Sequence, residues 1–175
     1  MKVLGRLIDN EYPNKGYDHV RQIVRCFVYN DNKEIALIYL LGDDIFGHRD
    51  LYETPGGGVK KGERLLTALK REIKEEIGAD IDSIIPLGRI IDFYNIINRK
   101  NDNHYYLAHL KNIDNKEIHR EPYEISIFKG VEWIKYDKVI ETYQKKMNEP
   151  LGRLVANREI IAFQEALKYF TNGLI

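Results

Sequence analysis

The sequence has a single cysteine, no net charge and no long hydrophobic run. Cys26 is the only cysteine among 175 residues, which excludes an internal disulfide and fits a reducing compartment. No stretch approaches the roughly 18 apolar residues of a membrane span, and the first sixteen residues are too polar for a secretory signal. We therefore expect a soluble, cytoplasmic protein with no membrane partner.

Basic and acidic side chains balance, with 27 lysines and arginines against 27 aspartates and glutamates. Without a global positive field, a nucleic-acid polymer is not expected as a partner, whereas a small anionic substrate carried with a metal ion needs no such field. Hydrophobic residues make up 43% of the chain, enough for a substantial core. We see no internal repeat, so residues 1–175 are predicted to form a single domain.

The apolar pattern predicts strands around a central helix, with more helices near the C-terminal end. This order predicts an α/β fold in which a mixed β-sheet is sandwiched between helices. Residues 98–103 are interpreted as a polar turn between two strands. The expected strands are 21–29, 34–41, 51–54, 87–94, 104–110 and 131–134, and the expected helices are 65–77, 139–147 and a C-terminal helix at about 154–171, clearest over 159–169.

The central helix follows a glycine-rich loop, residues 56–62, and ends at Gly78. At about 100° per residue, its apolar positions form one stripe that should face the core. The predicted stripe consists of Leu66, Leu69, Ile73 and Ile77.

Three glutamates, Glu72, Glu75 and Glu76, lie beside this stripe on an arc of roughly 100°, so some should be partly buried. Adjacent carboxylates repel one another unless a cation compensates. Oxygen ligands suit Mg²⁺, with Mn²⁺ as a substitute, completed by phosphate and water. The alternative is an exposed helix with pairs such as Arg71–Glu75 at i,i+4. We interpret the helix as a metal platform.

A metal platform of this kind predicts hydrolysis of a pyrophosphate bond. Bound metal ions neutralise pyrophosphate oxygens and lower the pKa of a water molecule. Cys26 stands alone, and no serine or histidine stands in a recognisable nucleophile motif. Attack of water on phosphorus is therefore the simplest mechanism.

The spacing of this stretch resembles the signature of the Nudix hydrolases, Mg²⁺-dependent enzymes that cut nucleoside diphosphates linked to another group. One position departs from the signature, because Ala79 stands where the family has Ile, Leu or Val. The resemblance covers about residues 19–145 and implies the Nudix fold. The matching positions are Gly57, Glu63, Arg71-Glu72-Ile73, Glu75-Glu76 and Gly78.

The resemblance also implies roles for these side chains. An ion pair between Glu63 and Arg71 would orient the loop and the helix. The metal ligands would be Glu72, Glu75 and Glu76, with the Gly57 carbonyl as a further ligand.

In the family, a catalytic base or extra ligand often comes from a late loop before a strand that ends in tryptophan. Here that loop is 121–124, and Trp133 follows. Glu121 and Glu124 are therefore both candidates, and Glu132 is a third. The sequence does not choose among them.

Substrate contacts are expected outside the signature. Tyr94 and Tyr105 could stack on a base, and Arg99 on the polar turn could meet a distal phosphate or sugar. Half-buried strand positions and a solvated loop explain these residues equally well. Nucleotide sugars including ADP-ribose, nucleoside triphosphates and dinucleoside polyphosphates compete as substrates, with a slight preference for a nucleoside diphosphate linked to another moiety.

Two other functions stay open. A Nudix-fold nucleotide sensor without hydrolysis would usually have lost one of its glutamates, and all three are present here. An RNA-end processing enzyme shares the chemistry, and the neutral net charge argues against its polynucleotide groove. Some Nudix enzymes build their site across a dimer, so a homodimer is among the assemblies that the resemblance allows.

Overall fold

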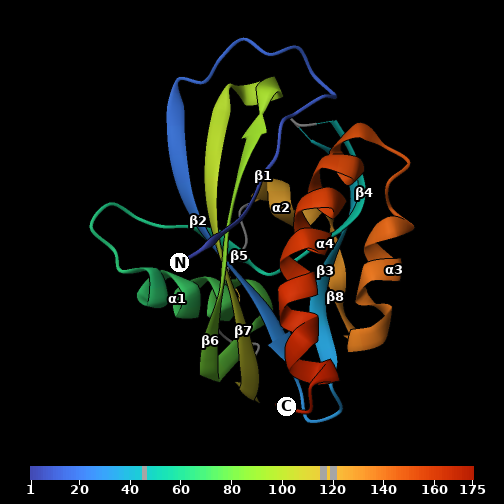
Figure 1. Cartoon of the computed structure of the whole chain (residues 1–175). Coiled ribbons are helices and arrows are strands. Elements are labelled where there is room, and N and C mark those ends of the chain that lie inside the picture. Colours follow the sequence, from blue (N-terminus) through green and yellow to red (C-terminus); the bar gives the residue numbers. More distant parts are fainter. Residues whose placement is uncertain (45–46, 115–117, 119–121) are drawn as a thin grey trace.

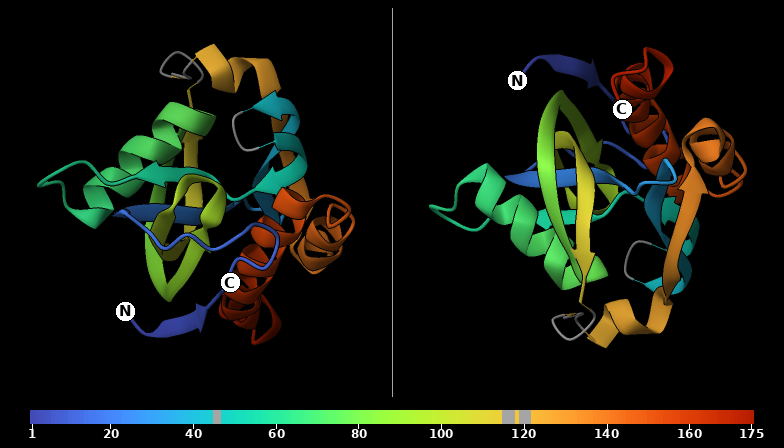
Figure 2. Two further views of the ribbon diagram at one scale, coloured as in Figure 1. Left: turned by 90° about the horizontal axis from the view of Figure 1, so that it is seen from above. Right: turned by 90° about the horizontal axis from the view of Figure 1, so that it is seen from below.

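The computed structural model describes residues 1–44, 47–114, 118 and 122–175, except for the side chains of 122–124. Within these residues, one mixed sheet of eight strands lies between helices, as predicted (Figures 1 and 2). The strands are β1 Val3–Arg6, β2 His19–Tyr29, β3 Glu34–Asp44, β4 Gly47–Glu53, β5 Gly56–Gly58, β6 Ala79–Tyr94, β7 Arg99–Ile113 and β8 Phe128–Lys135. The helices are α1 Leu65–Ile77, α2 Pro122–Ile127, α3 Val139–Gln144 and α4 Pro150–Thr171.

The sheet divides into two halves that diverge from one hairpin. The strand order is β1-β6-β7-β2-β3-β4, with β5 added to β2 and β8 added to β3. Strands β2 and β3 meet at Tyr29 and Ile35, next to the turn. Farther along, β2 pairs with β5 through Val24 and Gly57, whereas β3 pairs with β4 and β8. A space therefore opens between β2 and β3, and the candidate site lies in it.

Helix α1 begins and ends where the sequence predicted, and Gly78 closes it in the left-handed conformation with φ of 67°. Its buried residues are Ala68, Leu69, Ile73 and Ile77. Leu66 was predicted to be buried, and this was wrong, because the side chain is 50% exposed. A helical wheel gives the angle of a side chain but does not say whether the sheet extends to the first turn of the helix.

The expected polar turn at 98–103 was also wrong. The connection between β6 and β7 is a short 3₁₀ turn, Asn95–Ile97, and β7 already begins at Arg99. Asn101 and Asn103 are fully buried strand residues. Asn103 keeps its polar group satisfied there, since Nδ2 donates to Asp92 Oδ1 at 2.9 Å and to the Ile90 carbonyl at 3.2 Å.

The C-terminal helix α4 is longer than expected, because Pro150 occupies its first turn, where the missing N–H is tolerated. It packs against β4 and β6 with a buried face that includes Ala162 and Phe163. Figure 1 shows α4 and α1 on different sides of the sheet. No helix in the described part of the chain is long and apolar enough to cross a membrane.

Candidate active site

Strand β5 carries the glycines of the signature past the carboxylates of α1. A side chain at Gly57 would overlap the carboxylate of Glu72, and a Cβ at Gly58 would lie 2.5 Å from Arg21 Nη2. A side chain at either position would therefore displace the charged end of Glu72 or of Arg21. The close approach brings the backbone of the loop against one acidic and one basic group.

The predicted ion pair between Glu63 and Arg71 is present. Arg71 donates from Nε to Glu63 Oε1 at 2.9 Å and from Nη2 to Glu63 Oε2 at 2.8 Å. Its Nη2 also donates to the Gly58 carbonyl at 3.1 Å. The hydrogen bonds from Arg71 lower the pKa of Glu63 to about 2. This bidentate contact fastens the loop to the helix.

The three helix glutamates lie in different environments. Arg71 Nη1 donates to Glu72 at 2.6 Å and to Glu75 at 2.9 Å. Burial raises the pKa of Glu72 against the opposing effect of Arg71, and burial raises the pKa of Glu76 to about 8. The Gly56 N–H donates to Glu76 Oε2 at 2.7 Å. The predicted partial burial of these carboxylates is confirmed.

A divalent cation fits this donor set. Ionising the half-buried Glu76 beside Glu72 is unfavourable without a positive charge, and both side chains offer the oxygen ligands that Mg²⁺ prefers. Among the described residues, no group of three His, Cys, Asp or Glu side chains is close enough to form a cation site by itself. Phosphate and water oxygens would therefore have to complete the coordination, as is usual for Mg²⁺.

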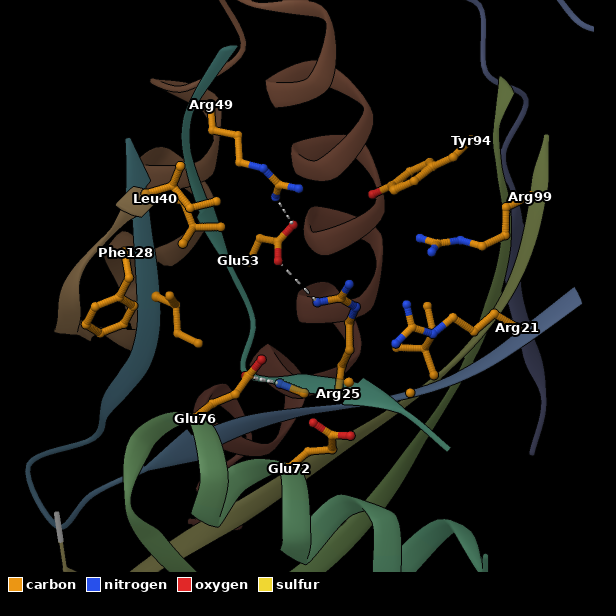
Figure 3. A pocket seen from close by; sticks show the side chains of 16 residues that line it. Arg21, Arg25, Leu40, Arg49, Glu53, Glu72, Glu76, Tyr94, Arg99 and Phe128 are labelled. Atoms are coloured by element: carbon orange, nitrogen blue, oxygen red, sulfur yellow. Dashed lines mark hydrogen bonds and ion pairs between the residues drawn. The ribbon is translucent and has the colours of Figure 1, made fainter. Parts of the chain in front are cut away.

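A cavity of about 240 Å³ lies between the two halves of the sheet (Figure 3). Glu72 and Glu76 line it from α1, whereas Ile38, Leu40 and Phe128 form an apolar wall. Glu75 is not part of the lining and stays with Arg71 on the helix surface.

Four arginines and a further glutamate also line the cavity, and the sequence analysis did not single out most of them. Glu53 lies between Arg49 Nη1 at 3.5 Å and Arg25 Nη1 at 4.0 Å (Figure 3). Burial opposes its ionisation, but these two arginines lower the pKa of Glu53. The alternation of Arg21, Ile23 and Arg25 along β2, which puts all three on one face, is the signal that could have found the two β2 arginines.

The predicted substrate residues separate into two groups. Tyr94 and Arg99 line the cavity. Tyr105 does not, because it is fully buried and its hydroxyl donates a hydrogen bond to Glu159 Oε1 at 3.1 Å. In this arrangement Tyr105 cannot stack on a ligand in the cavity. Its position on β7 faces Phe27 and α4, which a strand pattern does not reveal.

The candidates for a late catalytic residue are only partly placed. Glu132 accepts a hydrogen bond from the Tyr52 hydroxyl at 2.8 Å and is not part of the cavity lining. Glu121 lies outside the described residues. Glu124 belongs to α2 by its backbone, and its side chain also lies outside them.

Comparisons with known proteins identify the family to which this domain belongs. A model of the NUDIX domain matches residues 19–157. An RNA pyrophosphohydrolase of Hydrogenovibrio crunogenus is 27% identical over 145 residues, covering 72% of this chain and 88% of the relative. A NUDIX hydrolase from Nitrosomonas europaea has a similar structure, with a TM-score of 0.63 at 16% identity, over 86% of this chain and 91% of that one.

A MutT NUDIX hydrolase from Burkholderia pseudomallei gives a TM-score of 0.56 at 19% identity, over 81% of this chain and 98% of that one. The structural likenesses establish the fold, and the domain match covers most of the chain. The predicted resemblance is thus confirmed: the chain belongs to the NUDIX domain family, whose members are hydrolases of pyrophosphate bonds.

Proposed function

We propose that this chain is a Mg²⁺-dependent pyrophosphohydrolase for a small nucleotide, a nucleoside diphosphate linked to another moiety. The observation that supports this most is the joint lining of one cavity by two α1 carboxylates, Glu72 and Glu76, and by four arginines. Such a cavity can take a divalent cation and a polyphosphate together. The single buried Cys26 is in keeping with a reducing, cytoplasmic location.

The residues that would hold Mg²⁺ are Glu72 and Glu76, with Glu75 and the Gly57 carbonyl as the further ligands that the family signature implies. When bound, the metal supplies charge neutralisation at the pyrophosphate and a water of lowered pKa. Manganese could substitute for magnesium, since it also accepts oxygen ligands.

The protein itself contributes orientation. Arg71 fixes the loop through Glu63 and holds Glu72 and Glu75 in place. The apolar wall of Ile38, Leu40 and Phe128 limits water on one side of the cavity. Such fixed donors and charges lower a barrier because they need little reorganisation during the reaction.

A proton acceptor for the attacking water would come from the late loop. Glu121 and Glu124 keep this role as proposals, because α2 joins the loop to Ile127 and Phe128, which line the cavity. Glu132 is disfavoured, since its carboxylate is held by Tyr52 away from the lining.

A hydrolysis screen tests the proposal. ADP-ribose, nucleotide sugars, nucleoside triphosphates and diadenosine polyphosphates are each incubated with Mg²⁺, and the products are resolved by mass. Cleavage at a pyrophosphate bond that is lost in Glu76→Gln supports the proposal. Cleavage that persists in the variant contradicts it, and tight binding without products would favour a nucleotide sensor.

A second candidate substrate is a phosphorylated RNA end. It is favoured by the similarity to the Hydrogenovibrio protein, which is an RNA pyrophosphohydrolase. Three exposed lysines, Lys60 and Lys61 before α1 and Lys70 on it, could contact an RNA backbone. A steep decrease of RNA affinity with salt would support this alternative, because each phosphate contact releases counterions.

A further inference from the structure

Arg21 and Arg99 bring two positive charges together on one side of the cavity. Arg21 comes from β2 and Arg99 from β7, and in Figure 3 their side chains extend toward the same space. Burial lowers the pKa of Arg99, and the positive charge of Arg21 lowers it further. Two guanidinium groups on one side of a partly buried cavity destabilise each other unless an anion lies near them.

In the described part of the chain, neither side chain has a hydrogen bond or an ion pair with a carboxylate. The Nε of Arg99 is buried without a partner. By contrast, the other cavity arginines, Arg25 and Arg49, both lie beside Glu53. Arg21 is attracted to Glu72, and Arg99 to Asp92 and Glu53, only at longer range. The hydrogen-bond donors of both arginines are therefore available to a ligand.

A buried amide opposite Arg21 in the sheet also lacks hydrogen-bond partners among the described residues. Asn101 pairs in register with Arg21 and lies on the same face of β7 as Arg99. It is fully buried, and within the described residues neither amide atom has a hydrogen-bond partner. Buried polar groups are nearly always paired, but Asn101 does not line the cavity, so it makes no direct contact with a ligand there.

The neighbouring aromatic ring is already occupied, which argues against a base at this position. The Arg99 guanidinium lies 5.5 Å from the centre of the Tyr94 ring. Arg158 donates to the Tyr94 hydroxyl at 2.8 Å. A polar anion therefore suits this side of the cavity better than a stacked base.

We propose that Arg21 and Arg99 form a subsite for a terminal phosphate of the substrate, on the side of the cavity formed by β2 and β7. A terminal phosphate carries a charge of about −1.5 to −2 at pH 7, whereas a bridging phosphate with two ester or anhydride links carries one ionisable oxygen. Two arginines match the higher charge, and each can bind phosphate in a bidentate manner.

The inference rests on the proposed function and narrows it. Of the competing substrates, those that end in a free phosphate fit the subsite, namely nucleoside triphosphates and triphosphorylated RNA ends. Nucleotide sugars and ADP-ribose have no terminal phosphate and would leave both arginines without a partner of matching charge.

Binding without divalent metal tests the subsite separately from hydrolysis. Adenosine triphosphate and its γ-methyl ester are titrated calorimetrically into the wild-type protein in a chelator. We expect the free triphosphate to bind about 10–100-fold more tightly, the range of one or two charge-assisted hydrogen bonds. In the double variant Arg21→Gln/Arg99→Gln this ratio should decrease to about 1–3.

Arg64→Gln is the matched control, since Arg64 is exposed beside the loop and should leave the ratio unchanged. Arg99→Lys should keep part of the preference for the free triphosphate over its methyl ester. Equal binding of the two ligands to the wild-type protein, or an unchanged ratio in the double variant, overturns the subsite, as does no binding of either ligand. If the binding ratios are as expected but the wild-type protein hydrolyses none of the substrates in the screen, only the proposed function is contradicted.

A third ligand separates the sources of the terminal phosphate. A short RNA with a 5′-triphosphate should show the same arginine-dependent preference over its 5′-hydroxyl form. If RNA binds more tightly than the mononucleotide, the substrate is an RNA end. If the mononucleotide binds as well as the RNA, the other nucleotides of the RNA contribute nothing to binding, and a free nucleotide is the indicated substrate.

Discussion

Arg71 holds Glu63 through two parallel hydrogen bonds, at 2.9 Å from Nε and 2.8 Å from Nη2. The remaining Nη1 donates to Glu72 and Glu75. One guanidinium therefore joins the loop to the helix and orients two of the three helix glutamates. A lysine ammonium cannot reproduce this fork, because it is a point charge on a flexible stem.

Arg71→Lys should reduce kcat/KM by about 10–100-fold, since the lost charge-assisted hydrogen bonds are worth about 1.5–3 kcal/mol. Steady-state kinetics on the substrate found in the screen measures the effect. The exposed Arg64 provides the control, and Arg64→Lys should retain wild-type kinetics. Wild-type kcat/KM in Arg71→Lys would show that the fork is dispensable.

The stability contributed by Glu63 should depend on pH. Its folded-state pKa of about 2 lies below the ordinary value of 4.5. The ionised form is thus favoured by folding, and its contribution is present above pH 4.5 and is lost as pH decreases toward 2. The free energy of unfolding of the wild type minus that of Glu63→Gln should shrink over this range. A difference that stays constant between pH 7 and pH 2.5 would be inconsistent with the ion pair.

Glu76→Gln should separate folding from metal binding. The folded-state pKa of Glu76 is raised to about 8, so this group's contribution to stability decreases as pH increases from 4.5 toward 8. A glutamine keeps an acceptor for the Gly56 N–H, and the metal-free variant should be at least as stable as the wild type at pH 7.

Magnesium should then stabilise only the wild type. A ligand at 100 times its Kd adds about 2.7 kcal/mol, which thermal unfolding with and without Mg²⁺ can detect. An equal Mg²⁺-dependent increase in Tm for the wild type and Glu76→Gln would place the metal elsewhere.

Glu159 anchors α4 behind the cavity. Its carboxylate is fully buried and accepts hydrogen bonds from Thr54 Oγ1 at 2.5 Å, from Arg158 Nη2 at 2.7 Å and from the Tyr105 hydroxyl. Glu159→Gln leaves the fully buried Arg158 with one fewer anion. We expect the free energy of unfolding, measured with urea, to decrease by about 3–5 kcal/mol.

Glu165→Gln on the same helix is the matched control. Glu165 pairs with Lys2 and Lys168, whose side chains are largely exposed, so its loss should cost at most about 1 kcal/mol. Similar losses for the Glu159 and Glu165 variants would contradict the proposed anchoring.

Local signals predicted the site better than they predicted the sheet. Helix α1 was predicted from Leu65 to Ile77 because its periodicity, its glycine loop and its Gly78 cap are all near in sequence. The partly buried glutamates followed from the same geometry. The buried positions of Asn101 and Asn103 did not, since polar residues at the start of a strand look like a loop in the sequence.

The arginines of the cavity illustrate a second limit of prediction from the sequence. Arg25 on β2 and Arg49 on β4 are far apart in the sequence, and only the fold brings them together beside Glu53. Strand β1, with only four residues, carries too little pattern to be recognised. Long-range pairing thus decides both the cationic side of the cavity and the edge of the sheet.

The central claim is that carboxylates on α1 hold the Mg²⁺ that makes this chain a pyrophosphohydrolase. The most direct test is the initial rate of pyrophosphate-bond cleavage against free Mg²⁺, for the wild type and Glu76→Gln. The wild-type rate should increase from near zero in a chelator to a plateau, and the variant should stay at least about 100-fold lower. Cleavage that survives the chelator, or a variant that reaches the wild-type plateau, would contradict the claim.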